Sequence, residues 1–325
     1  MPRPVAALDA GTNTVRLYIA QPGHGGRLEE LVRTTRFVGL GEGVDATGRF
    51  KPEAIERALQ AIDEYALLMT EYDVERAMMV ATSASRDAAN RAEFFDQVEQ
   101  RLGFQPDLIS GTQEAQLSFK GALTGARDPR GPVLVVDSGG GSTELVMGET
   151  TGAITDKISL DVGSRRLRER LLPADPPTAE QIAQARAEVD QQLATVFDLS
   201  QVATCIGVAG TVTTMAALLL GLDQYDRAKV HGSIHSADEL STLADRLLTM
   251  TVDQVRVLGP VEPKRAPVLC AGALIVAEIA SRLPVPLIAS EADILDGIGA
   301  LLANRQSTSP QSRDGGLVAK HFRPS

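Results

Sequence analysis

The chain is short of the residues on which several classes of protein depend. Of its 325 residues only two are cysteines, each within an apolar run, so buried thiols of a reducing compartment, the cytoplasm, are expected rather than disulfides. Lys and Arg total 32 against 42 Asp and Glu, and this net charge of −10 argues against a nucleic-acid-binding surface. Apolar runs stay below about 18 residues, and a strand containing Asp9 begins almost at once. We therefore expect neither a membrane span nor a signal peptide.

Several catalytic motifs are also missing. The sequence lacks a Walker-type Gly-x-x-x-x-Gly-Lys-[Ser/Thr], Cys-x-x-Cys pairs and a Gly-x-Ser-x-Gly elbow. His231 and His235 stand four residues apart, but Gly232 and Ser233 between them favour a loop, so a zinc site is not expected. Serine and zinc hydrolases are thereby disfavoured.

The most informative stretch that is present runs from Val133 to Leu145. Four apolar residues predict a buried strand that ends in Asp137, and Ser142 and Glu144 follow a run of glycines. That run consists of Gly139, Gly140 and Gly141. Without Cβ atoms its N–H groups can approach a bulky anion, so the stretch could hold a phosphate with its metal ion. The alternative is a tight glycine hairpin with a solvated glutamate at its rim.

The same spacing occurs near the N-terminus. The pattern Asp9-x-Gly11-x-x-Thr14-x-Arg16 has the same spacing as the pattern that begins at Asp137. The first residues of the two copies are 128 positions apart (137 − 9). A separation of that size predicts an internal duplication with one copy in each domain. Two glycine turns that face each other would hold a phosphate from both sides, with Arg16 in the register that Glu144 occupies in the second copy.

Two further residues are candidates for chemistry. Arg86 follows a buried strand, at the edge where α/β sheets bind ligands, and could hold an oxyanion, although an ion pair with Asp87 is an alternative. Glu114 lies in the first turn of a helix that starts at Gly111, with Thr112 as a plausible N-cap. It could act as a base on water, or could simply suit the helix dipole.

Two other segments could bind anions. Residues 165–170 carry four arginines, of which Arg165 and Arg166 come first, and could form a track for a polyanion. The alternative is a solvated helix face paired with Glu169. Gly210 and Thr211 form a third glycine turn at a strand end, with Thr211 as the expected helix cap.

Paired glycine turns, carboxylates, arginines and a candidate base are the parts that phosphoryl transfer to water needs. Mg²⁺ suits oxygen ligands and substrate phosphates. We predict an α/β fold with domain I at residues 1–121 plus about 286–305 and domain II at residues 122–285. The polar residues 306–325 are expected to be a disordered tail.

Taken in the order in which they occur along the chain, the motifs resemble those of the Ppx/GppA family of exopolyphosphatases and guanosine pentaphosphate phosphohydrolases. They are Asp9 to Leu17, Ala81 to Asp87, Ile109 to Ala115, Val133 to Leu145, Ser159 to Ser164, Gly207 to Thr211 and Ala271 to Leu274. The resemblance implies two duplicated actin-like (ASKHA, ribonuclease H-like) domains flanking a cleft. Length and residues 43–50 look most like the short actinobacterial exopolyphosphatases, without an HD-like C-terminal region.

The resemblance also implies roles for single residues. Glu114 matches the catalytic base, and Asp137 and Glu144 lie at the catalytic Mg²⁺ site, with Asp9 as a further metal ligand. The implied phosphate-binding residues are Thr12, Asn13, Arg16, Arg86, Gly139, Gly140, Gly141, Ser142, Gly210 and Thr211. The sequence departs from the family pattern at two positions. The family usually has two consecutive acids in the Glu114 motif, and here Gln113 stands in place of the first. Arg165 is an additional cation just before Arg166, which matches the family's arginine.

The implied reaction is Mg²⁺-assisted hydrolysis of the terminal phosphate of inorganic polyphosphate by a water that Glu114 activates. A pppGpp 5′-phosphohydrolase is the alternative within the same class. A non-catalytic polyphosphate or nucleotide sensor and a sugar or acetate kinase are alternatives of other classes. No nucleic-acid or membrane partner is expected, and a homodimer is possible.

Overall fold

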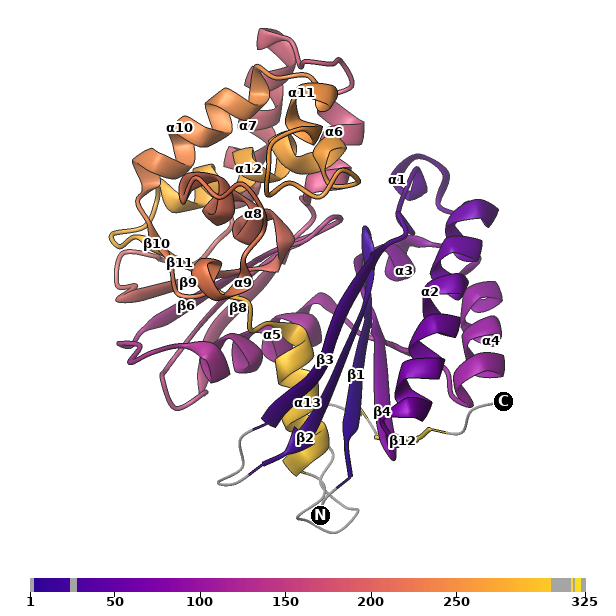
Figure 1. Ribbon diagram of the computed structural model, residues 1–325. Helices are drawn as coiled ribbons and strands as arrows, with labels where there is room; N and C mark the ends of the chain where they lie inside the picture. Colours follow the sequence, from indigo (N-terminus) through magenta and orange to yellow (C-terminus); the bar gives the residue numbers. More distant parts are fainter. Residues whose placement is uncertain (1–2, 24–27, 305–316, 318, 323–325) are drawn as a thin grey trace. The chain divides into compact units, whose positions relative to one another are not determined.

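The computed structural model describes residues 3–23, 28–304, 317 and 319–322 of the chain. It divides into two compact units, unit 1 with residues 1–117 and 294–325, and unit 2 with residues 118–293. Each unit contains a six-stranded sheet with helices packed against it (Figure 1). The predicted α/β class is confirmed.

Unit 1 is built on a sheet in the order β12-β4-β1-β2-β3, with β5 paired to β4. Its strands are β1 (Val5–Ala10), β2 (Thr14–Pro22), β3 (Leu28–Phe37), β4 (Arg76–Ala81), β5 (Asp107–Leu108) and β12 (Lys320–His321). Its helices are α1 (Val44–Thr47), α2 (Pro52–Glu71), α3 (Ser83–Asp87), α4 (Arg91–Leu102) and α13 (Ile294–Asn304), and α5 (Gly111–Gly125) begins here and continues into unit 2.

Alternate residues of β1 enter two different cores of unit 1. Ala6 and Leu8 pack with the apolar faces of α2 and α4, whereas Val5 and Ala7 pack with α13 on the opposite face. Figure 1 shows α2 and α4 together on one side of this sheet and α13 on the other. Because both faces are covered, every residue of β1 is buried, which explains its apolar run from Val5 to Leu8.

Unit 2 contains a sheet in the order β10-β11-β9-β6-β7-β8. Its strands are β6 (Val133–Ser138), β7 (Thr143–Gly148), β8 (Ile154–Leu160), β9 (Thr204–Val208), β10 (Ile234–His235) and β11 (Leu287–Ala289). Its helices are α6 (Ser164–Leu171), α7 (Ala179–Leu193), α8 (Ala209–Leu219), α9 (Arg227–Val230), α10 (Ala237–Leu248), α11 (Val252–Arg256) and α12 (Ala266–Ala280). The apolar α12 lies in the centre of its core.

The two sheets repeat one topology, as the duplicated sequence pattern predicts. In unit 1, β1 pairs antiparallel with β2 and parallel with β4, and β2 pairs antiparallel with β3. In unit 2, β6, β7, β8 and β9 make the corresponding pairs. A parallel fifth strand extends each sheet, β5 beside β4 and β11 beside β9.

Two predicted boundaries are wrong. β11 was assigned to domain I, but its parallel pairing with β9 places it in unit 2, because hydrogen bonding rather than chain order decides which sheet a strand joins. Part of the predicted disordered tail is ordered: Leu317 is buried beside α13, and β12 pairs with β4. The rest of that tail lies outside the described residues. No described helix is both long and apolar enough to cross a bilayer.

Candidate active site

The two hairpins that carry the repeated motif have the same geometry. In unit 1 the N–H of Gly11 donates to the carbonyl of Thr14 at 2.9 Å, and in unit 2 the N–H of Gly139 donates to the carbonyl of Ser142 at 3.0 Å. The register pairs Asp9 with Arg16 and Asp137 with Glu144 in equivalent positions. Directly opposed residues of an antiparallel pair point to the same face, so each hairpin presents two ionisable side chains beside its turn.

In unit 1 these two side chains compensate each other. Nε and Nη2 of Arg16 donate to Oδ2 of Asp9 at 3.0 and 2.8 Å, and Asp9 is only 5% exposed. The turn between them is fixed from outside, since the carbonyls of Thr12 and Asn13 accept the N–H groups of Gly41 and residues 38–39. Asp9 therefore orients Arg16 beside a rigid turn.

In unit 2 the equivalent side chains are both acids. Glu144 is 1% exposed and accepts a hydrogen bond from Ser159 at 2.7 Å, and Asp137 accepts one from Ser118 at 2.5 Å. Like charges directly opposite each other destabilise a sheet unless a cation lies between them. The two hydroxyl groups hold the carboxylates in place but do not neutralise them. This pair has the chemistry of a divalent-cation site.

The carbonyls of the glycine turn are bound to the start of α6. The N–H of Ser164 donates to Gly139 at 2.9 Å, and the N–H groups of Arg165 and Arg166 donate to Gly140 at 2.8 and 3.1 Å. The N–H groups of Gly140 and Gly141 donate to no acceptor among the described residues. Two adjacent N–H groups on a fixed turn can bind phosphate oxygens.

We expect Gly163→Ala to displace this turn. A Cβ at residue 163 would lie 2.6 Å from backbone atoms of Gly140 and Gly141, which cannot move away as a flexible side chain could. The variant should lose about 1–3 kcal/mol of unfolding free energy, measured by urea denaturation, together with most of its phosphate-releasing activity. Gly11→Ala, whose Cβ would lie 3.4 Å from its nearest neighbour, is the control for stability. Wild-type stability and activity of Gly163→Ala would contradict the packing argument.

Arg86 and Glu114 lie together in unit 1. Nη1 of Arg86 donates to the Glu114 carboxylate at 2.8 Å and to the carbonyl of Ile109 at 3.0 Å, and both side chains are largely buried. Arg86 therefore forms an ion pair with Glu114. The pair holds Glu114 in one orientation at the start of α5.

The N-cap of α5 differs from the prediction. Ser110 Oγ accepts the N–H of Gln113 at 3.2 Å, and the Gln113 side chain accepts the N–H of Ser110 at 3.0 Å. This reciprocal pair makes Ser110, not Thr112, the cap, and the spacing Ser-x-x-Gln was a readable signal for it. Gln113 has a structural reason to be present, because it closes the first turn that carries Glu114.

The third glycine turn also differs in its cap. α8 begins at Ala209, with Val208 at the N-cap position, so Thr211 lies inside the first turn and the predicted cap is wrong. Ala209 has a φ of 69°, a strained conformation for a residue with a side chain. A Cβ at Gly210 would lie 2.0 Å from Nη1 of Arg265, so only glycine lets this guanidinium lie on the turn.

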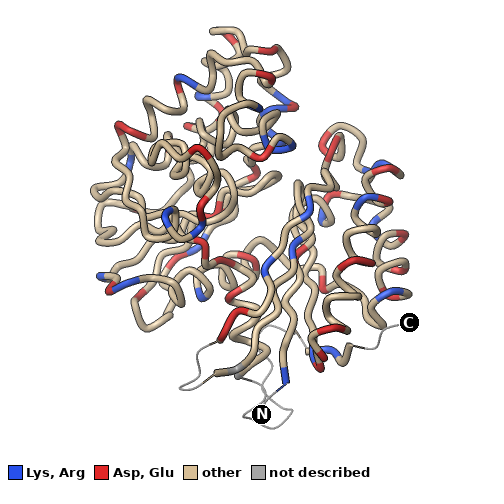
Figure 2. The backbone as a smooth tube through the Cα atoms, in the orientation of Figure 1, with Lys and Arg blue, Asp and Glu red and all other residues tan. Residues whose placement is uncertain are grey.

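The arginines of α6 all have intramolecular partners. Arg166 is 8% exposed and paired with Asp161, Arg165 lies 3.4 Å from Glu169, and Arg168 donates to carbonyls after the helix. In Figure 2 the basic residues of this segment lie beside acidic ones. A polyanion would have to compete with these ion pairs, and the track remains a prediction.

Other titratable groups of unit 2 are structural. Burial raises the pKa of the Cys205 thiol to about 12 and lowers the pKa of His235 from its ordinary value. The raised pKa keeps Cys205 as the unreactive thiol. No cluster of three or more His, Cys, Asp or Glu side chains that could hold a metal occurs within the described ranges.

Three side chains at the site were not identified from the sequence. Ser118 supports Asp137, Ser159 supports Glu144, and Arg265 lies on the Gly210 turn. Ser118 follows Glu114 by four residues, one helical turn, so helical periodicity could have indicated it. No local signal indicates Arg265, because its contact depends on how α12 packs near α8.

Comparison with known proteins agrees with this arrangement. The profile of the Ppx/GppA phosphatase family matches residues 18–291. The chain belongs to the Ppx/GppA phosphatase family. It is 44% identical over 315 residues to a Mycobacterium tuberculosis protein named Exopolyphosphatase 2, and the match covers 92% of this chain and 98% of that protein.

Solved structures of Ppx/GppA proteins share the fold. An exopolyphosphatase-like protein has a TM-score of 0.89 and 40% identity, and the match covers 93% of this chain and 99% of that one. The Aquifex aeolicus family member has a TM-score of 0.81 and 32% identity, covering 94% of this chain and 99% of that one. The resemblance read from the sequence motifs is confirmed. The roles of the individual site residues remain predictions.

Proposed function

We propose that this protein is an exopolyphosphatase that hydrolyses the terminal phosphate of inorganic polyphosphate. The substrate class is supported by the relative named Exopolyphosphatase 2, which matches over nearly its whole length. The observation that carries the chemistry is the directly opposed pair of Asp137, which is partly buried, and Glu144, which is buried, beside a turn with two available N–H groups. An acid pair next to a phosphate-binding turn suits a substrate that brings a divalent cation with it.

Mg²⁺ is the cofactor that this donor set fits. Asp137 and Glu144 would be its carboxylate ligands, since Mg²⁺ is usually bound by one or two carboxylates with water and substrate phosphates completing the shell. Asp9 of unit 1, the further metal ligand that the family resemblance implies, contacts Arg16 and is better suited to orient that guanidinium. When bound, the ion would neutralise charge on the phosphates.

Each unit carries groups that would bind phosphate, on the Asp9 hairpin in unit 1 and on the Asp137 hairpin and α8 in unit 2. The N–H groups of Gly140 and Gly141 would bind phosphate oxygens, and Arg16 would supply a cation held in place by Asp9. Thr12, Asn13, Gly139, Ser142, Gly210 and Thr211 complete the proposed phosphate-binding set. Ser142 and Thr211 are nearly buried, so their hydroxyl groups are fixed in position.

The attacking water would be activated by Glu114. Its carboxylate is fixed at the start of a capped helix by Arg86, so it can accept a proton without first reorienting. Arg86 would share its donors between this carboxylate and phosphate oxygens. The developing negative charge is then met by donors that are already in place.

Phosphate release from several substrates tests the proposal. We would measure kcat/KM for long polyphosphate, short polyphosphate and pppGpp, each with Mg²⁺ and with a chelator. The expected result is Mg²⁺-dependent release with polyphosphate preferred. A preference for pppGpp would instead assign a pppGpp 5′-phosphohydrolase. Binding of polyphosphate without phosphate release would assign a sensor and overturn the enzymatic proposal.

A further inference from the structure

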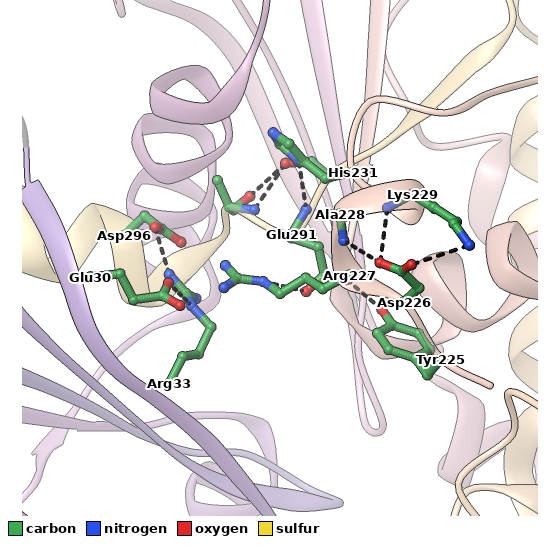
Figure 3. Close-up of polar contacts among 12 residues, drawn as sticks. Glu30, Arg33, Tyr225, Asp226, Arg227, Ala228, Lys229, His231, Glu291 and Asp296 are labelled. Atoms are coloured by element: carbon green, nitrogen blue, oxygen red, sulfur yellow. Dashed lines mark hydrogen bonds and ion pairs between the residues drawn. The ribbon is translucent and has the colours of Figure 1, made fainter.

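A short segment of unit 2 contacts both chain segments that lead toward unit 1. The boundaries between the units fall inside α5, between Leu117 and Ser118, and between Asp293 and Ile294. Residues 225–231 contact the end of α5 and residue Glu291 just before the second boundary. Figure 3 shows Tyr225, Arg227 and His231 gathered around Glu291.

His231 makes two different hydrogen bonds through its ring. Nε2 lies 3.1 Å from the carbonyl oxygen of Gly125, and Nδ1 accepts the N–H of Glu291 at 3.1 Å. Because Nδ1 is an acceptor, the neutral ring carries its proton on Nε2 and donates it to Gly125. The His231 imidazole thus links the end of α5 to the segment that contains Glu291 and leads to the boundary at Asp293.

The bond to Gly125 terminates α5. Gly125 is the last residue of that helix, and the last carbonyls of a helix have no partner within it. His231 supplies the missing donor. The junction is tightly packed as well, since a Cβ at residue 125 would lie 2.6 Å from Cβ of Ala292 and 2.9 Å from Cε1 of His231.

The segment that presents His231 is itself held firmly. The N–H of Gly232 donates to the carbonyl of Ala289 at 2.8 Å, and the N–H of Ala289 donates to Ser233 at 2.9 Å, beside the pairing of β10 with β11. The Glu291 carboxylate accepts hydrogen bonds from Tyr225 and from Arg227 Nε. His231 therefore connects α5 to a fixed part of the sheet rather than to a loose loop.

The helix held in this way carries the proposed base. Glu114 and Gly125 are eleven residues apart in one continuous helix, about 16 Å along its axis. A helix transmits an axial shift of one end to the other, because its turns are hydrogen-bonded in series. A shift at Gly125 would displace Glu114, and a displacement of about 1 Å can cost about a hundredfold in rate.

We propose that His231 is a positioning residue for phosphate hydrolysis, which fixes the axial position of α5 and so the position of the Glu114 carboxylate. The inference rests on the proposed function, because it concerns the same reaction. Of the two hydrogen-bond partners of His231, only Gly125 is on the helix that carries Glu114, so the effect of His231 on Glu114 passes through α5. Its effect should therefore fall on the chemical step and not on polyphosphate binding.

The chain offers a matched control four residues away. His235 is 3% exposed, and its Nε2 bonds to Ser233 Oγ at 2.8 Å within its own segment. Both histidines are in unit 2 and each loses its hydrogen bonds when replaced by phenylalanine. His235→Phe should therefore reproduce the general cost of the substitution without releasing α5.

The test compares four variants of the full-length protein in Mg²⁺-dependent hydrolysis of polyphosphate. His231→Phe should lower kcat about ten- to a hundredfold, with KM within about threefold of the wild type. His231→Gln, whose side-chain amide can still donate to Gly125, should recover most of kcat. His231→Asn, whose shorter side chain can place an acceptor near the Nδ1 position but is too short to donate at the Nε2 position, should recover less. His235→Phe should keep kcat near the wild-type value.

Hydrogen exchange gives a readout that does not depend on turnover. Amides in the last turn of α5 should exchange faster in His231→Phe than in wild type or in His235→Phe. The inference is overturned if His231→Phe keeps wild-type kcat, if His235→Phe loses kcat in parallel, or if Asn restores kcat as well as Gln. A wild-type protein that releases no phosphate would instead overturn the proposed function, and the positioning role with it.

Discussion

Replacing Glu114 with Gln is expected to lower kcat for phosphate release from polyphosphate by about 10²–10⁴-fold, the range for loss of a general base. The amide cannot accept the proton of the attacking water, although it can still accept a hydrogen bond from Arg86. Polyphosphate affinity should change little, because the phosphate-binding groups are on other residues. Steady-state kinetics together with a direct binding measurement would separate the two effects.

The neighbouring residue provides the control for Glu114→Gln. Gln113→Glu restores the first acid usual in the family and keeps the reciprocal cap with Ser110, since Glu serves at this position as Gln does. We expect kcat within a few-fold of wild type. Turnover of Glu114→Gln near the wild-type value would exclude Glu114 as the base, whatever the result for Gln113→Glu.

Replacing Glu144 with Gln should have opposite effects on stability without and with Mg²⁺. Without Mg²⁺ the variant should be more stable than wild type by about 1 kcal/mol, because it removes one of two like charges facing each other across β6 and β7. The amide oxygen can still accept the hydrogen bond from Ser159. With Mg²⁺ the order should reverse, since a ligand at 100 times its Kd adds about 2.7 kcal/mol to the protein that binds it.

The same variant should lose activity. Loss of a charged ligand from the proposed Mg²⁺ site is expected to lower kcat by about a hundredfold or more. Thermal unfolding over a Mg²⁺ titration measures the first effect and phosphate release the second. Glu149→Gln is the matched control, because it removes the same charge from an exposed position just after β7. Equal Mg²⁺-induced shifts of Tm in Glu144→Gln and wild type would place the ion elsewhere.

Local patterns predicted the elements that are defined by neighbours in the chain. Pro52 and the apolar periodicity that follows it in the sequence predict a helix over residues 52–70, and α2 is Pro52–Glu71. The sequence also predicts a helix from Arg91 to Leu102, and α4 has those bounds. The repeated acid and glycine spacing predicted both hairpins, because a two-stranded turn is determined by a few adjacent residues.

Sequence patterns failed where two local interpretations competed. The sequence of residues 107–110 predicts a short strand, but β5 ends at Leu108 and Ser110 is the N-cap of α5. A serine can end a strand or cap a helix, and the hydrogen bond it makes decides between them. The same competition misplaced the cap at Thr211, because α8 begins at Ala209 with its cap at Val208, three residues earlier.

By itself the sequence determined the α/β class, the duplication, the family and the residue types of the site. Only the tertiary structure decided which side chains are partners. Arg86 meets Glu114 across 28 residues, and His231 meets Gly125 across 106 residues. Such pairs depend on the packing of helices on sheets, and no short-range spacing encodes them.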